Sequence, residues 1–179
     1  LNEVFKIEEV RVASRTKESR ELYAKKMREK LDLNVIPTDS VEQAVKGADI
    51  IVTVTTADEP LIKKDWIEPG MTILKLGSYQ ELDLDIVTSV DKVIVDKWGF
   101  ISHRSKEIVE LLEAGIITRE NIYAEITEIV AGKKAGRVND DETILVIALG
   151  MGGDYVALFS NLYKTAKEMG VGQKLKFSD

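Results

Sequence analysis

The sequence predicts an α/β fold, in which a doubly wound parallel sheet carries helices on both faces. Short apolar, β-branched runs alternate with helical segments along most of the 179 residues, and such alternation is typical of parallel sheets. Two of the runs, 49–54 and 71–76, are largely apolar, as expected of strands buried on both faces. Apolar residues make up 44% of the chain, which is enough for a substantial core.

The expected strands are short runs bounded by polar or turn-forming residues. Valine and isoleucine are frequent in them, and these β-branched side chains fit a pleated sheet. In chain order, the expected strands cover residues 10–13, 34–37, 49–54, 71–76, 92–96 and 143–149. Pro37 marks the end of the second strand or an edge of the sheet, because proline cannot donate a ladder hydrogen bond.

The expected helices are recognised by capping residues at their starts and glycines at their ends. Ser40 and Gln43 form a capping box, and Ser105 and Asn121 are further N-cap candidates. The helices cover residues 17–31, 40–47, 105–115, 121–132 and the segment after 154. Apolar stripes that we expect to face inward contain Leu22, Tyr23, Met27 and Leu31 in the first helix, and Val156, Phe159, Tyr163 and Ala166 in the last.

The composition argues against several classes of function. Lysine and arginine total 25 against 31 acidic residues, for a net charge of −6, so neither nucleic acid nor an anionic membrane is an expected partner. The chain has no cysteine, which excludes disulfides and a thiolate nucleophile. No His, Asp and Glu cluster has metal-ligand spacing. We expect a cytoplasmic protein with a small-molecule ligand and no metal.

Small residues follow the two most apolar runs. Thr55 and Thr56 come after the first, and Gly77 and Ser78 after the second. The carboxyl ends of parallel strands form the rim where open α/β sheets bind ligands, and a glycine there permits close approach of a ligand. Each pair also has a simpler explanation, since threonines cap loops and glycine with serine forms tight turns.

Ser14, Arg15 and Thr16 follow the first expected strand. In dinucleotide-binding folds the residue that ends the second strand faces the adenosine ribose. An acidic residue there suits NAD, and an arginine suits the 2′-phosphate of NADP. Arg15 with its neighbouring hydroxyls therefore favours NADP. The alternative is a surface arginine at a turn, with a serine or threonine as N-cap of the next helix.

Three other features have plainer explanations. The glycines at 150, 152 and 153 match neither a GxGxxG nor a Walker sequence, and a flexible turn lining a pocket is the better interpretation. His103, the only histidine, is either a general acid or, more simply, a solvated turn residue. Asp96 ends a strand and is interpreted as structural.

Several different short motifs lie along nearly the whole chain in a definite order. They are Val10–Thr16, Ser40–Asp49, Ile51–Thr55, Pro60, Trp66–Gly70, Leu76–Ser78, Glu81–Asp83, Val95–Asp96, Ala124–Lys133, Gly136–Arg137, Leu149–Gly150, Asp154 and Tyr163. Their order and spacing together resemble the ornithine cyclodeaminase/mu-crystallin family.

The resemblance implies a Rossmann-like NAD(P) domain from a two-domain protein that is usually a homodimer. In the enzymes of the family, hydride is exchanged at the α-carbon of an amino acid or cyclic imine, and mu-crystallin represents members that bind without turnover. By position, Arg15 and Thr16 would lie near the adenosine end of NADP or NAD, and Thr55 beside the cofactor. Gly77 and Ser78 would lie under it, and Leu149 and Gly150 near the nicotinamide.

The sequence departs from the family's pattern in three places. The glycine-rich first strand would precede Leu1, so we expect residues 1–150 to form a Rossmann-like domain that is incomplete at its amino terminus, with a gap in the sheet. The substrate-binding Lys and Arg residues would precede Leu1 as well. Residues 151–179 would form a C-terminal helix that returns to a second domain.

The third departure is the short turn from Gly77 to Glu81, which lacks the Asp that cyclodeaminases carry there. This favours a reductase or a non-catalytic NADP-binding protein over a cyclodeaminase, and an inactive fragment is the remaining alternative. The catalytic residues are not identified from the sequence.

Overall fold

The computed structural model describes residues 1–176, except for the side chain of Asp154. The chain divides into two compact units, 1–149 and 150–179. The first unit contains all the strands that the structure describes. They are β1 (Val10–Val12), β2 (Val35–Pro37), β3 (Ile50–Thr53), β4 (Thr72–Lys75), β5 (Lys92–Val95), β6 (Ala124–Glu125) and β7 (Ile144–Ile147).

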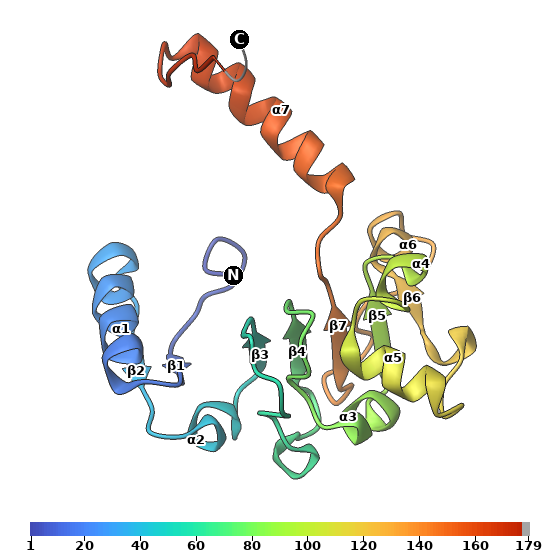
Figure 1. Ribbon diagram of the computed structural model, residues 1–179. Coiled ribbons are helices and arrows are strands. Elements are labelled where there is room, and N and C mark those ends of the chain that lie inside the picture. The colour runs from blue at the N-terminus through green and yellow to red at the C-terminus, as the bar shows by residue number, and fades with distance from the viewer. Residues whose placement is uncertain (177–179) are drawn as a thin grey trace. The chain divides into compact units, whose positions relative to one another are not determined.

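The larger sheet has five parallel strands in the order β3-β4-β7-β5-β6. The last strand in the chain, β7, therefore lies at the centre, and Leu145 is paired with Ile73 of β4 and Val93 of β5. All carboxyl ends face one edge, at the top of Figure 1. The α/β class with a parallel sheet is thus confirmed.

A second sheet consists only of β1 and β2, which pair in parallel from Val10↔Val35 to Val12↔Pro37. No described hydrogen-bonded ladder joins this pair to β3 or to any other strand of the larger sheet. The strands therefore form two separate sheets, and the predicted incompleteness of the domain stays a prediction. Helix α2 (Val41–Val45) lies in the connection from β2 to β3. The guanidinium of Arg11 in β1 donates to the carbonyls of Gln43 and Lys46, so β1 is bonded to this connection.

Helices and short helical turns fill the connections. They are α1 (Lys17–Leu31), α2, a 3₁₀ turn η1 (Lys64–Trp66), α3 (Leu84–Ser89), α4 (Trp98–Ile101), α5 (Lys106–Glu113), a 3₁₀ turn η2 (Arg119–Asn121), α6 (Ile126–Val130) and α7 (Gly152–Glu168). Of the predicted capping box of α2, the Ser40 half is confirmed, because Ser40 Oγ accepts the Gln43 N–H, but the reciprocal bond to the Ser40 N–H is not formed. The Gln43 side chain turns back to the Asp39 N–H.

Two predicted caps serve other purposes. Ser105 makes no capping hydrogen bond to α5, because its hydroxyl donates to Glu107 Oε2 at 3.1 Å. The helix expected from Asn121 does not form as one piece. Asn121 ends η2, and Ala124 and Glu125 then pair with β5 as β6 before α6 begins. Pairing with β5 outweighs the local helical pattern there.

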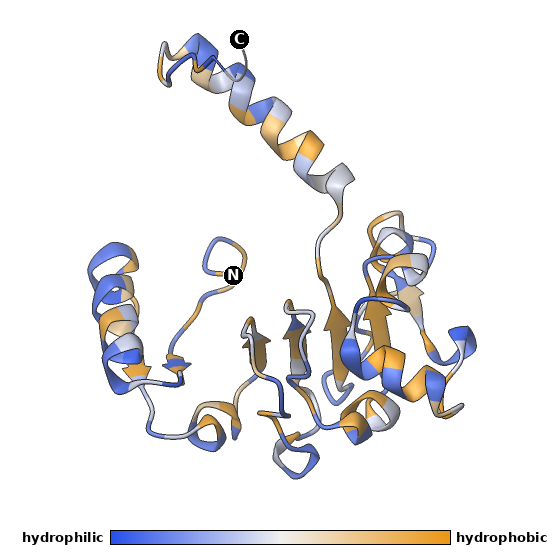
Figure 2. Ribbon diagram, in the orientation of Figure 1, coloured by the Kyte–Doolittle hydropathy of each residue, from blue (hydrophilic) through white to orange (hydrophobic). Residues whose placement is uncertain are grey.

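The core lies between the five-stranded sheet and helices α3 and α5. It combines strand residues such as Ile73 and Leu145 with Ile86 and Ile108 of the helices, all at most 2% exposed. Strands β5 and β7 are the most buried part of the sheet, and both are largely orange in Figure 2. The expectation that β3 is buried on both faces is wrong. Val52 is 45% exposed, because the described residues cover only one face of this strand.

Two predicted inward stripes are also wrong. In α1, Leu22 and Tyr23 are about half exposed, and Ala24 is the buried residue. In α7, Val156 and Phe159 are largely exposed. Unit 150–179 contains only one helix among its described residues, so it offers no second element against which a stripe could pack.

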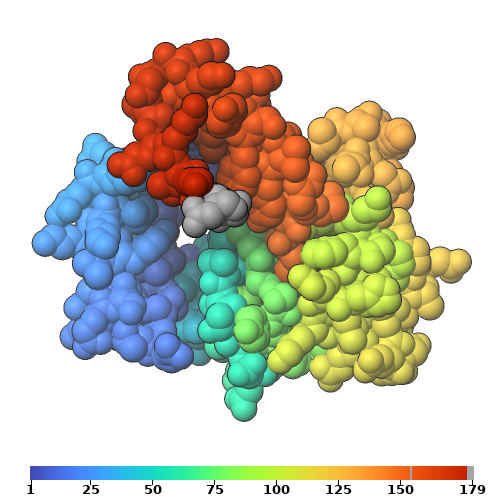
Figure 3. All heavy atoms as spheres, turned by 45° about the horizontal axis from the view of Figure 1, so that its top comes forward, coloured from blue at the N-terminus to red at the C-terminus, as the bar shows by residue number. Residues whose placement is uncertain are grey.

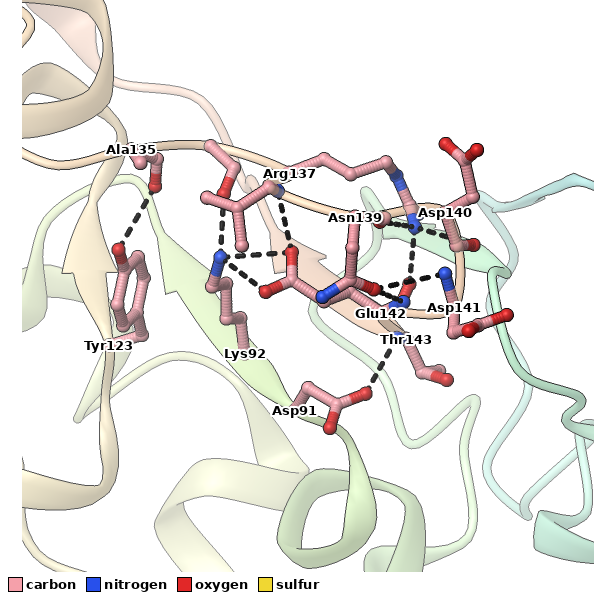
Figure 4. A network of polar contacts seen from close by, with 12 residues as sticks. Asp91, Lys92, Tyr123, Ala135, Arg137, Asn139, Asp140, Asp141, Glu142 and Thr143 are labelled. Atoms are coloured by element: carbon pink, nitrogen blue, oxygen red, sulfur yellow. Dashed lines mark hydrogen bonds and ion pairs between the residues drawn. The ribbon is translucent and has the colours of Figure 1, made fainter.

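A polar network fastens the loop before β7, at the amino ends of the strands (Figure 4). Lys92 Nζ donates to Gly136 O at 2.7 Å and to Glu142 Oε2 at 2.9 Å. Arg137 donates to Gly70 O and Thr72 Oγ1. The hydrogen bond from Lys92 is the main reason that the pKa of Glu142 is lowered, and the backbone N–H of Val138 adds to the effect.

Candidate functional site

The carboxyl ends of β3, β4 and β7 surround a pocket of about 300 Å³ in unit 1–149. Its lining consists of Thr55, Leu76, Gly77, Ser78, Tyr79, Phe100, Arg104 and Leu149. In Figure 3 the ends of β3 and β4 (cyan and green) lie next to the segment around 98–113 (yellow-green). The volume is at the lower end of the range for small-molecule sites, so it suits one part of a larger ligand.

Four residues predicted from the sequence meet in this pocket. Thr55 comes from the end of β3, Gly77 and Ser78 from the end of β4, and Leu149 from the end of β7. They approach one another because β3, β4 and β7 are parallel neighbours. Figure 1 shows these strand ends at one edge of the sheet. Their grouping is what a rim for a ligand requires, and their roles as ligand contacts stay a prediction.

Gly77 lies where a side chain would not fit. A Cβ atom built on it would lie 2.8 Å from Glu81 Oε2 and 3.1 Å from the carbonyl oxygen of Thr55. The backbone of Gly77 therefore packs directly against the Glu81 side chain and the Thr55 backbone behind the pocket. This close packing is a physical reason for glycine at the end of β4, and it leaves the outer side of the backbone open to a ligand.

The other predicted residues are not part of the pocket lining. Thr56 is exposed and does not line the pocket. Gly150 belongs to unit 150–179 and has φ +81°. A Cβ atom there would lie 2.7 Å from the hydroxyl of Tyr155 in the same unit, which explains the glycine without a ligand.

Ser14, Arg15 and Thr16 lie at the carboxyl end of β1, as predicted. Thr16 is the N-cap of α1, and its Oγ1 accepts the Ser19 N–H. The Ser14 hydroxyl donates to Thr16 O at 2.8 Å. Both hydroxyls thus have local partners. Arg15 is exposed, and no partner for its guanidinium is found among the described residues, so it is the one of the three that is available to a phosphate.

Sequence reasoning missed the aromatic and basic part of the lining. Phe100 of α4 and Arg104 after it both face the pocket, and the Arg104 guanidinium lies 5.1 Å from the centre of the Phe100 ring. The signal for them was the apolar turn Trp98–Ile101 directly after β5, another strand whose end points to the same edge. His103, the candidate general acid, lines a neighbouring depression and not this pocket.

The described residues hold no group of three or more His, Cys, Asp or Glu that could bind a metal. Nor does any described helix have the length and apolar character needed to cross a membrane. The pocket lining itself offers backbone, hydroxyl and guanidinium groups to a ligand.

Comparison with known proteins identifies the family. The model of the ornithine cyclodeaminase/mu-crystallin family matches residues 1–170. The chain belongs to this family. Among solved structures, the Delta(1)-pyrroline-2-carboxylate reductase of Thermococcus litoralis, in complex with NADH and L-proline, superposes with a TM-score of 0.91 at 31% identity. That match covers 97% of this chain and 55% of the reductase.

Two further proteins are similar to this chain. An archaeal alanine dehydrogenase dimer with bound NAD gives a TM-score of 0.85 at 27% identity, over 99% of this chain and 55% of that one. A Delta(1)-pyrroline-2-carboxylate reductase of Bacillus cereus is 30% identical over 175 residues, which are 96% of this chain and 54% of the relative. The chain thus spans about half the length of the curated relatives it matches.

Proposed function

We propose that this chain forms the NAD(P)-binding part of an oxidoreductase that acts on a small amino acid or a cyclic imine. The observation that carries the proposal is the pocket at the ends of β3, β4 and β7. It occurs in a chain that is similar over 97% of its length to a reductase solved with NADH and L-proline. The cofactor would be NAD(H) or NADP(H), with Arg15 favouring NADP.

The lining of the pocket suits such a ligand. Gly77 lets the ligand approach the end of β4 closely, and Thr55 and Ser78 offer hydroxyl groups for hydrogen bonds. Leu149 adds an apolar side chain to the lining, which would exclude water from the nicotinamide ring of a bound cofactor. Arg104 gives the pocket a positive charge, which suits an anionic ligand.

A bound NAD(P)H would supply the hydride for the imine carbon, and the nitrogen would need a proton from elsewhere to give the amino acid and NAD(P)⁺. None of the lining residues carries a carboxyl, imidazole or ammonium group. Tyr79 also lines the pocket, and its phenolic hydroxyl is a group that can donate a proton. A second candidate is a binding protein of the same family that holds NADP without turnover, and the short turn after Gly77, which lacks the Asp that cyclodeaminases carry there, is what favours it.

The first measurement is the intact mass of the native protein, because it establishes the length of the polypeptide in which these residues work. NADH and NADPH are then titrated into that protein, and we expect their fluorescence to change on binding. If neither nucleotide binds, the proposal is wrong and the inactive-fragment alternative gains support.

Turnover distinguishes the two candidates. The protein is mixed with NADH or NADPH and with Delta(1)-pyrroline-2-carboxylate, and in the reverse direction with L-proline or L-alanine and the oxidised cofactors. A change in the absorbance of the reduced nicotinamide supports the oxidoreductase. Binding without such a change for any pair supports the binding protein. Release of ammonia from ornithine would instead indicate a cyclodeaminase.

We further propose a homodimer, because the archaeal alanine dehydrogenase to which this chain is similar is a dimer. Light scattering on the purified native protein would give its mass in solution. A monomer at micromolar concentration would contradict this proposal without affecting the cofactor assignment.

A further inference from the structure

A fully buried ionic cluster lies directly behind the pocket. Lys75, Glu81, Ser105 and Glu107 are all 0% exposed, and we refer to them as the buried cluster. They come from the end of β4, from the loop after it and from the start of α5. Every buried side-chain nitrogen and oxygen among the described residues has a hydrogen-bond partner.

Glu107 joins three of these segments. Its Oε2 lies 3.0 Å from Lys75 Nζ and accepts the Ser105 hydroxyl at 3.1 Å. Its Oε1 accepts the backbone N–H groups of Glu81 at 2.9 Å and of Leu82 at 3.2 Å. The backbone of the loop that carries Glu81 is therefore fixed by a carboxylate on α5.

Glu81 in turn reaches the two strand ends that form the pocket. One carboxylate oxygen accepts the backbone N–H of Thr55, and the other accepts the Thr53 hydroxyl at 3.0 Å. The same side chain fills the space behind Gly77. Lys75 completes the connection, because its ammonium donates to Gly77 O at 2.6 Å.

Stability alone is a weak explanation for this arrangement. Removing charges from water is unfavourable, and well-packed apolar side chains of similar volume are often as stabilising as a buried ion pair. A fully satisfied polar network, in contrast, fixes the geometry of the groups that it joins. Here the joined backbone groups belong to Thr55 and Gly77, which line the pocket.

We propose that Glu81 is a positioning residue for the cofactor pocket, because its carboxylate holds the end of β3 in register with the end of β4. The inference rests on the proposed binding of NAD(P). Glu81 itself does not touch the ligand, since it is 0% exposed and lies behind the lining. It acts through the N–H of Thr55 and through the packing of Gly77.

The test compares Glu81→Leu with Glu81→Gln in the native full-length protein. Leucine is close to glutamate in volume but accepts no hydrogen bond, whereas glutamine retains one carbonyl oxygen for the Thr55 N–H and an amide that can donate to Thr53 Oγ1. We expect Glu81→Leu to weaken NADH binding by roughly tenfold or more and Glu81→Gln to restore most of it. The Thr55 amide resonance in NMR spectra should move in Glu81→Leu and stay in place in Glu81→Gln.

The control is Glu142→Leu, which breaks the Lys92–Glu142 pair at the opposite ends of the strands. This variant should lose stability but keep its affinity for NADH. Equal NADH affinity in wild type and folded Glu81→Leu would overturn this inference but leave the proposed function intact. A wild-type protein that binds no nucleotide would overturn the proposed function, and the inference with it.

If Glu81→Leu fails to fold, Thr53→Val replaces it as the test. This change removes one hydroxyl that Glu81 binds while keeping the volume of a buried side chain. We expect a loss of NADH affinity of about threefold or more. An unchanged affinity in folded Thr53→Val would count against the inference.

Discussion

At the scale of single residues, Gly77 shows how packing and function constrain the same position. The sequence shows only that a glycine follows an apolar run, which a tight turn explains equally well. In the structure the missing side chain is required by the oxygen atoms of Glu81 and Thr55 behind it. The contact with Thr55 could not be predicted from local sequence, because Thr55 approaches Gly77 only through the pairing of β3 with β4. Glu81 is close in sequence, but its burial behind Gly77 is set by the bonds that its carboxylate makes to Thr53 and Thr55.

We expect Gly77→Ala to lower the free energy of unfolding by about 1–3 kcal/mol, because the added methyl group would displace the carboxylate of Glu81 or the carbonyl of Thr55. The same displacement should weaken nucleotide binding. Urea unfolding measures the first effect. The matched control is Gly99→Ala in α4, where a Cβ atom meets nothing within 4 Å and helix propensity favours alanine. Equal stability losses in both variants would contradict the packing argument.

Arg15 is the residue on which the preference between the two nucleotides depends. Arg15→Asp should reduce affinity for NADPH relative to NADH by roughly 10- to 100-fold, the usual effect of losing a charge-assisted hydrogen bond to a phosphate. Fluorescence titration of both nucleotides gives the ratio. Lys26→Asp makes the same charge change on an exposed position of α1. A similar shift in that control would assign the effect to net charge.

At the scale of elements, local signals predicted most strands and helices but not all of their contacts. The bounds of α1 follow from Thr16 and the apolar pattern, and they agree with the prediction of residues 17–31. Strand β6 was missed because two residues carry no periodicity of their own. Its existence depends on the edge that β5 presents to Ala124 and Glu125, which is a tertiary effect.

The loop before β7 should respond to acid through Glu142. The folded state lowers the pKa of this carboxyl below its ordinary value of 4.5, so its charge stabilises the fold above that pH. The contribution is lost as the pH falls below 4.5 through the lowered pKa. Hydrogen exchange of amides in 133–143 should therefore accelerate on acidification more than exchange in β4, after correction for intrinsic rates.

Glu142→Gln tests the same loop at neutral pH. The variant should be less stable than wild type at pH 7, because Lys92 loses its carboxylate partner, and the two proteins should become more alike in acid. Glu113→Gln, at an exposed position at the end of α5, serves as the control. A difference between wild type and Glu142→Gln that does not change with pH would contradict the electrostatic explanation.

At the scale of the whole molecule, the parallel sheet and its binding edge could be predicted, because alternating strands and helices leave few other arrangements. The pocket could be predicted only in part. Thr55, Gly77 and Ser78 follow strands and were found in this way, and Leu149 was found through the family resemblance. Arg104 was missed because it follows a short helix whose direction depends on packing. The buried cluster escaped prediction because charged residues are rarely buried.

The exposed apolar residues of α7 lead to a prediction for the molecule in solution. A helix of 17 residues is marginal in water without tertiary packing. If α7 has no partner in the native protein, its amides should exchange with solvent far faster than those of β7, as mass spectrometry can measure. Protection of α7 equal to that of β7 would show instead that Val156 and Phe159 are covered.

The central place of β7 has a consequence for the order of events during synthesis. Strands β3 and β4 can pair as soon as they leave the ribosome, and so can β5 and β6. The two pairs cannot join until Ile144–Ile147 arrives between them. At about 5–20 residues per second, β4 then waits several seconds with the backbone N–H and C=O groups of one edge unpaired. That interval is when a nascent chain of this topology is most open to chaperones and to aggregation.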